Sequence, residues 1–274
     1  GESAFCKCYN LRYLQIPATV ESIEDTAFAD CYRLYEIENL SKYPLTVDGS
    51  AQNRYTIKIY QTADEARIIK ETSNGCTVAK LSKDSSVWYL IDYESDATSI
   101  TLPSVTGELQ IKPYTFIAED KITSVTFSDS VSVVGKYAFK DSGVETVTFA
   151  GGKSSLTWTS ETFNESQALK EIDFGEREFS KIPMGAFAEK ENLETVRISS
   201  EVTTIEDGAF ADCYQLKEIS GCQKVSSIGA SAFYGCGNLS AMEFGNVTQV
   251  SGITTVDGID KTSRVLMADG ITYP

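Results

Sequence analysis

The chain has 274 residues, of which 42% are hydrophobic and 23% charged, so it can bury a core and does not have the composition of a disordered chain. It carries 24 basic and 39 acidic residues, giving a net charge of −15 with no basic cluster, which argues against nucleic acid and anionic membranes as partners. Histidine is absent, which excludes histidine-based acid–base catalysis and histidine-containing zinc sites. No apolar run approaches the roughly 18 residues that a membrane-spanning helix needs.

A short sequence recurs along most of the chain. The stretch from Ser22 to Cys31 returns almost unchanged from Thr204 to Cys213, and again from Ser227 to Cys236. Each copy carries one phenylalanine, and successive copies are 23 or 24 residues apart wherever the repeat is unbroken. The phenylalanines are Phe5, Phe28, Phe116, Phe139, Phe163, Phe187, Phe210 and Phe233. This period lies in the range of leucine-rich repeats, whose units bury their apolar faces only by stacking.

Each repeat contains two local patterns. After the phenylalanine comes Leu-x-x-Ile-x-apolar, whose period of two predicts a short strand with one buried face. The Ala-Phe-x-x-Cys segment is too short for a free helix, and we interpret it as one helical turn that packs its phenylalanine inward. The predicted fold is an α/β leucine-rich-repeat right-handed solenoid. Short parallel strands form its concave face, and short helical turns or strands form the other.

The full pattern, Ile-x-x-Ile-Gly-x-x-Ala-Phe-x-x-Cys-x-x-Leu followed by Ile-x-apolar, resembles the BspA-like, or Treponema pallidum type, leucine-rich repeats. The matching stretches are residues 20–37, 131–149, 182–198, 202–219 and 225–244. This resemblance implies a bacterial cell-surface or secreted protein, and several proteins of the class act as adhesins. It therefore implies an extracellular location, with a signal peptide or lipoprotein segment removed before Gly1.

Four segments follow from the spacing: repeats at 1–39, a non-repeat segment at 40–98, repeats at 99–250 and a degenerate last unit at 251–274. The non-repeat segment is either a cap that closes a first array or an insertion in one continuous solenoid. Within it, residues 55–60, 76–81 and 87–93 have strand-like sequences. Residues 63–71, which follow Thr62 and begin with two acidic residues, predict a helix.

Two recurring positions invite a chemical interpretation. Cys8, Cys31, Cys213 and Cys236 each follow a repeat phenylalanine by three residues, so we expect reduced core thiols. Acidic residues recur two places after the phenylalanine, at Asp30, Asp141, Glu165, Glu189 and Asp212. Such a stripe is either a solvated edge or a calcium site, and without Asp-x-Asp-x-Asp spacing we assign no metal and no other cofactor.

The candidate binding surface is the concave strand face. If leucine and isoleucine point inward, the residues between them point outward and form a polar surface suited to an extended partner. The candidate binding residues are Thr126, Thr148, Glu171, Asp173, Thr195, Arg197, Glu218 and Glu243. The predicted function is protein–protein interaction or adhesion with an extracellular or host protein.

Alternative functions remain open from the sequence alone. A glycan-binding module would use Trp88, Tyr89 and Trp158 as an aromatic platform, and a third possibility is a structural spacer in a larger surface protein. An enzyme would need a carboxylate pair such as Glu171 with Asp173 or Glu24 with Asp25. Because scattered acids on a shallow face are more simply a solvated surface, we predict no catalytic residues and no enzyme activity.

Overall fold

The computed structural model describes residues 1–45, 55–62, 64–94 and 96–239, and beyond them the backbone of four short strands. The chain divides into two compact units, Gly1–Tyr93 and Glu94–Pro274. Both are built mainly from short strands. Within the described residues no helix is long and apolar enough to cross a membrane.

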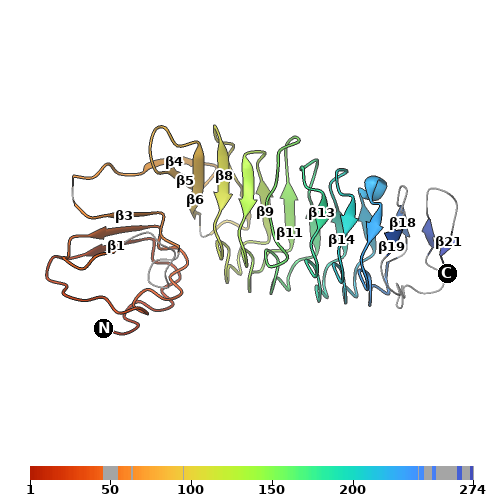
Figure 1. Ribbon diagram of the computed structural model, residues 1–274, viewed down its shortest axis with the longest axis horizontal. Helices are drawn as coiled ribbons and strands as arrows, with labels where there is room; N and C mark the ends of the chain where they lie inside the picture. Colours follow the sequence, from red (N-terminus) through yellow and green to blue (C-terminus); the bar gives the residue numbers. More distant parts are fainter. Residues whose placement is uncertain are drawn as a thin grey trace. The chain divides into compact units, whose positions relative to one another are not determined.

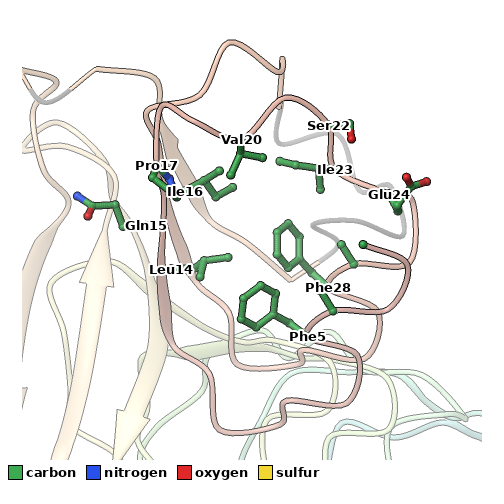
Figure 2. Close-up of a pocket in the computed structure, with 13 residues that line it drawn as sticks. Phe5, Leu14, Gln15, Ile16, Pro17, Val20, Ser22, Ile23, Glu24 and Phe28 are labelled. Carbon is green, nitrogen blue, oxygen red and sulfur yellow. The ribbon is translucent and has the colours of Figure 1, made fainter.

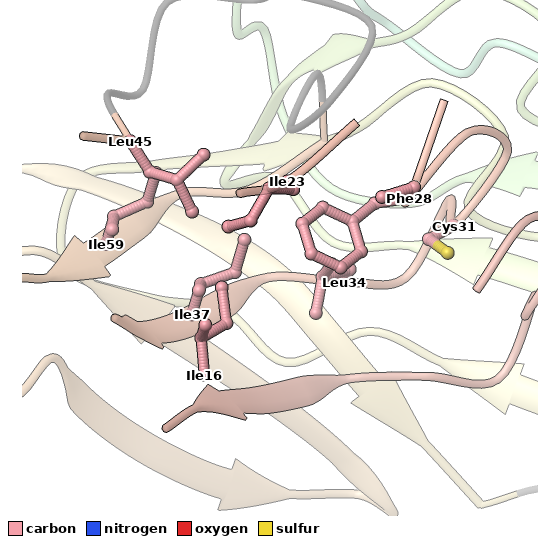
Figure 3. Close-up of a cluster of buried hydrophobic side chains, with 9 residues drawn as sticks. Ile16, Ile23, Phe28, Cys31, Leu34, Ile37, Leu45 and Ile59 are labelled. Atoms are coloured by element: carbon pink, nitrogen blue, oxygen red, sulfur yellow. The ribbon is translucent and has the colours of Figure 1, made fainter. Parts of the chain in front are cut away.

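Unit 1 begins with three parallel strands, β1 (Tyr13–Ile16), β2 (Glu36–Asn39) and β3 (Lys58–Tyr60). One inward residue from each strand reaches a common core, since the register places Leu14 against Ile37 and Ile37 against Ile59. Figure 3 shows this core, in which isoleucines of the strands meet Phe28 and Leu34 of the turns. Stacking therefore buries a face that no single repeat could bury alone.

The rest of unit 1 is an antiparallel meander of β4 (Ile69–Ser73), β5 (Cys76–Lys80) and β6 (Val87–Tyr93). Asn74 and Gly75 both have positive φ, 53° and 71°, as a tight hairpin turn requires. The strands expected at 76–81 and 87–93 are confirmed. The helix expected at 63–71 is wrong, because Ile69 and Lys70 pair with β5 and Ile68 is buried in the core of the meander. Tertiary packing of β-branched residues overrides the N-terminal capping signal.

Unit 2 contains a long parallel ladder, whose strands Figure 1 shows side by side in chain order. Its strands are β7 (Ser99–Thr101), β9 (Ser124–Phe127), β11 (Thr146–Phe149), β12 (Glu171–Asp173), β14 (Thr195–Arg197), β16 (Glu218–Ser220), β18 (Ala241–Glu243) and β20 (Arg264–Leu266). β21 (Thr272–Tyr273) pairs antiparallel to β20. These last two strands are all that the structure describes of the unit expected at 251–274, whose remaining residues lie outside the described part.

Each repeat forms one turn of the solenoid, which we call a rung. Further parallel strands form a second wall of the solenoid beside the long ladder. They are β8 (Glu108–Ile111) with β10 (Val131–Val134), and β13 (Lys181–Ile182), β15 (Thr204–Ile205), β17 (Ser227–Ile228) and β19 (Gln249–Val250). A β-solenoid of stacked parallel strands is thus confirmed for the fold.

The repeat phenylalanines form a column of stacked rings. Phe187, Phe210 and Phe233 are consecutive members, with ring centroids 5.2 and 5.5 Å apart and interplanar angles of 10° and 4°. The same stacking runs from Phe116 through Phe139 and Phe163 to Phe187. One ring per rung explains why the sequence period equals one turn of the solenoid.

The helical turns expected at Ala-Phe-x-x-Cys are wrong. The only helix in the described residues is the single 3₁₀ turn η1 (Cys222–Lys224). The residue two places after each repeat phenylalanine has a positive φ, 59° at Glu189 and 58° at Asp212, and a left-handed residue cannot continue a right-handed helix. Instead, the Phe187 and Glu189 N–H groups each donate 2.8 Å hydrogen bonds to carbonyls of the next rung. The turn wall is therefore hydrogen-bonded from rung to rung, as a sheet is.

Arg177 is fully buried, which the sequence did not predict. Its guanidinium donates to acceptors on the two preceding rungs. These are the carbonyls of Asp129 at 2.8 Å, Val131 at 3.3 Å and Ala150 at 3.2 Å, together with the closer Ser128 carbonyl and Ser154 hydroxyl. Burial lowers the pKa of Arg177, against a smaller opposing effect of Asp129. The side chain therefore ties together three rungs at their corners through hydrogen bonds rather than through an ion pair.

Candidate binding surface

The outward side chains of six neighbouring strands of unit 2 form what we call the strand face. The strand register aligns them in two columns. The first column is Ser99, Ser124, Thr146, Glu171, Thr195 and Glu218, and the second is Thr101, Thr126, Thr148, Asp173, Arg197 and Ser220. Neighbours in a column are about 4.8 Å apart, the spacing of paired strands.

Buried and solvent-exposed side chains alternate along each strand of this face. Inward Val147, Ile172 and Val196 are at most 1% exposed, whereas the outward residues on either side of them are half-exposed or exposed. Seven of the eight candidate binding residues lie together here. The eighth, Glu243, belongs to β18, but its side chain lies outside the described residues. The sequence pattern therefore identified side chains that share one surface, and the binding role of that surface stays a prediction.

Charge is unevenly distributed over the strand face. The outward residues of β7, β9 and β11 are all serine or threonine, whereas β12, β14 and β16 carry the charged groups. Arg197 pairs with Asp173 at 2.9 Å and with Glu176 at 2.8 Å, and the hydrogen bond to Asp173 is the main reason that the pKa of Arg197 is raised. Within the described residues, Glu171 and Glu218 have no ion-pair partner.

The acidic stripe has a backbone explanation. Asp30, Asp141, Glu165, Glu189 and Asp212 all occupy the left-handed position of the turn, with φ between 52° and 59°. Lys7, Ala118 and Gly235 take the same place in other rungs, so the conformation, not the charge, is what recurs. No group of three acidic or cysteine side chains able to hold a metal occurs among the described residues.

Both tryptophans considered for glycan binding pack against residues of their own units. Trp88 is 3% exposed, with Lys80 Nζ 4.6 Å from its ring centroid. Trp158 is half-buried and packs against aromatic rings of the core, with ring centroids 6.0 Å or less from Phe163, Phe174, Phe179 and Phe187. Alternation within a strand cannot tell which aromatic faces inward without a known register, which is why the sequence left this open.

The cysteine column is confirmed for three of its four members. Cys31, Cys213 and Cys236 are buried, and all seven cysteines are free. Burial raises the pKa of Cys213 to about 12, and its thiol donates to the Phe187 carbonyl of the preceding rung at 2.9 Å. Cys8, in the first repeat, is exposed.

A pocket of about 200 Å³ opens beside this first rung in unit 1. Figure 2 shows its apolar wall, which includes Phe5, Leu14, Ile16, Val20 and Phe28. Glu24 is the only ionisable side chain among the residues that line it. Glu24, one of the carboxylates considered for catalysis, therefore lines an apolar pocket rather than a cleft with a second acid.

The carboxyl groups offer little support for acid catalysis. A general acid near neutral pH needs a raised pKa. Every described carboxyl group whose pKa is shifted is shifted downward, as at Glu194 through its hydrogen bond to Lys217 and at Glu206 through its hydrogen bond to Lys181. Such shifts are typical of salt-bridged surface carboxylates.

The family of the chain follows from its repeats. A model described as the BspA type leucine rich repeat region matches six copies, over residues 1–76, 92–182 and 154–254. The chain belongs to this family. The comparison with curated proteins gave no match.

Solved structures of leucine-rich repeat proteins show a weaker likeness. The Treponema pallidum leucine rich repeat protein is 18% identical, with 62% of this chain and 91% of that chain covered and a TM-score of 0.40. A leucine rich cell surface protein from Faecalibacterium prausnitzii is 23% identical, with 95% and 65% covered and a TM-score of 0.43. A leucine-rich repeat protein from Bacteroides ovatus is 16% identical, with 89% and 81% covered and a TM-score of 0.28.

Proposed function

We propose that this BspA-type chain is a non-catalytic, cell-surface or secreted module that binds an extracellular protein through the strand face of unit 2. The observation that carries the proposal is the strand face itself, with two aligned columns of polar side chains on a continuous parallel ladder. Repeat proteins commonly use such extended surfaces for binding. The family supports an interaction role of this general kind.

The composition of the strand face suits an extended partner. Each strand contributes two short or charged polar side chains, so a partner lying across the strands meets a new pair about every 4.8 Å. Contacts of this kind are individually weak and gain strength from number. A glycan partner is less well supported, since Trp88 and Trp158 are occupied in packing.

Two arginines introduced on the strand face test the proposal. Thr148→Arg with Thr195→Arg adds bulk and charge at half-exposed positions of β11 and β14. Ser155→Arg with Thr157→Arg is the matched control, because both residues are exposed and pair with the neighbouring wall, at Glu178 and Val133. Binding to immobilised fibronectin, laminin and type I collagen is measured by biolayer interferometry.

We expect the unaltered chain to bind at least one of these proteins, the double variant to lose that binding, and the control to keep it. Equal loss in both variants, unchanged binding in the double variant, or no binding by the unaltered chain would each count against the proposal. The last result would favour a structural spacer.

A further inference from the structure

In unit 1 the chain covers part of its own strand surface with a basic segment. The outward residues of β2, Glu36 and Glu38, are only 6% and 5% exposed. Arg67 Nη2 lies 2.6 Å from Glu38 Oε1, and the Lys70 ammonium pairs with Glu36. Arg67 precedes β4 and Lys70 lies within it, so one piece of chain with two cations three residues apart occupies these carboxylates.

Aromatic side chains complete this arrangement. The Arg67 guanidinium lies 4.2 Å from the Tyr60 ring centroid, and the Tyr60 hydroxyl donates to Glu36 Oε1 at 2.7 Å. The Tyr13 hydroxyl donates to Glu38, and this hydrogen bond, followed by that from Arg67, lowers the pKa of Glu38. Each buried carboxylate is thus paired with a cation and also accepts a tyrosine hydrogen bond, as buried charges require.

Unit 2 carries the same carboxylate pair on its strand face. Glu171-Ile172-Asp173 of β12 matches Glu36-Ile37-Glu38 of β2, with a fully buried isoleucine between two outward acids. Here the second acid already has a cation, because Arg197 of the next strand pairs with Asp173 as Arg67 pairs with Glu38. The first acid, Glu171, is the counterpart of Glu36, and no cation takes the place of Lys70 among the described residues.

A second open carboxylate lies in the same column. Glu218 of β16 is two strands from Glu171, with Thr195 of β14 between them. Two strand spacings are about 10 Å, which is also the span of three residues of extended chain. In a β-strand the side chains at i and i+3 point to opposite faces, but in an extended polyproline II segment, with three residues per turn and a rise of about 3.1 Å, they point to the same side. Lysine or arginine side chains at this spacing, which is also that of Arg67 and Lys70, can therefore reach both acids.

We propose that the strand face of unit 2 binds an extended basic peptide segment of a protein partner, with cations at Glu171 and Glu218. This rests on the proposed function and names the chemical class of the partner. Asp173 is already paired with Arg197, so it does not pair with the peptide. The carboxylates that are left for the peptide on this part of the surface are those of Glu171 and Glu218.

The test uses a fluorescein-labelled nonapeptide of threonine with lysine at every third position, titrated with the full chain by fluorescence anisotropy. The buffer contains about 20 mM salt so that exposed ion pairs are weakly screened. Glu171→Gln with Glu218→Gln should weaken binding about five- to tenfold, as two exposed pairs allow. Asp120→Asn with Glu191→Gln removes the same charge at exposed turn positions and should change binding less than about twofold.

Arg197→Gln tests a change that should strengthen peptide binding rather than weaken it. Releasing Asp173 and Glu176 provides two further open carboxylates, so the lysine peptide should bind more tightly to this variant, whereas a purely structural role of Arg197 predicts equal or weaker binding. Equal weakening by the two double variants would mean that only net charge attracts the peptide, and would overturn the inference. If the peptide does not bind while the matrix-protein test still depends on Thr148 and Thr195, the basic partner class fails and the proposed function survives.

Discussion

Phe210→Ala tests how the solenoid is held together. The Phe210 ring is fully buried and stacks on Phe187 at 5.2 Å and on Phe233 at 5.5 Å. Removing a buried phenylalanine costs about 3–5 kcal/mol, and stacked pairs contribute about 0.5–1.5 kcal/mol each beyond burial. Because this ring has stacking neighbours on both sides, we expect Phe210→Ala to lower the free energy of unfolding by an amount in the upper part of the range of about 3–5 kcal/mol.

Two variants calibrate this value. Phe5→Ala removes a ring that is 37% exposed and contacts one neighbour in the column, Phe28 at 5.8 Å, so its cost should be less than half as large. Tyr214→Ala removes a ring that is 48% exposed and should change stability by less than about 0.5 kcal/mol. Urea unfolding gives the free energies, and hydrogen exchange of the flanking turns shows whether the loss spreads to both neighbouring rungs. If the Phe210→Ala and Tyr214→Ala variants unfold at the same urea concentration, the stacked column of phenylalanine rings is refuted.

Three further predictions concern buried polar groups. Arg177→Lys should destabilise unit 2 in urea, because an ammonium cannot reproduce the forked set of carbonyl hydrogen bonds; unchanged stability would contradict the corner role. Burial lowers the pKa of Lys112 from its ordinary 10.5 to about 8, so the unfolded chain binds this proton more tightly and stability should rise with pH between these values. Lys112→Met should abolish that rise, and an identical pH profile in the variant would disprove it. N-ethylmaleimide at neutral pH should label Cys8 in the native chain and leave Cys213 and Cys236 unlabelled until urea is added, whereas early labelling of either would contradict their burial.

The repeat strands could be predicted from sequence because two independent signals coincide there. The period of 23 or 24 residues aligns rungs, and the alternation within Leu-x-x-Ile-x-apolar fixes which side chains face inward. The register then follows, so that Thr146, Glu171 and Thr195 meet as neighbours although they are far apart in the chain.

The failures share a physical cause. Backbone conformation at the turns depends on hydrogen bonds between rungs, such as Phe187 N–H to the Ala209 carbonyl, and no property of one repeat reports such a bond. The helix expected at 63–71 was lost to strand pairing of Ile69 with Lys80, a contact that the local capping pattern does not encode.

Arg177 and the Glu36–Glu38 pair were missed for different reasons. Arg177 sits at a turn, where an arginine is normally solvated, and only the carbonyls of two other rungs make it a buried group. Glu36 and Glu38 did leave a signal, since Glu-Ile-Glu occupies the strand position of the repeat as Glu-Ile-Asp does at β12. Comparing the outward residues of all strands, not only those after Phe116, would have found them.

Carboxyl footprinting tests the strand face most directly. Carbodiimide-driven coupling of glycine ethyl ester modifies exposed acids, and mass spectrometry measures the rate at each site with and without the bound lysine peptide. The account predicts slower modification of Glu171 and Glu218, with unchanged rates at Asp120 and Glu191. Slowing at Asp120 and Glu191 with no change at Glu171 and Glu218 would place binding elsewhere and contradict the account.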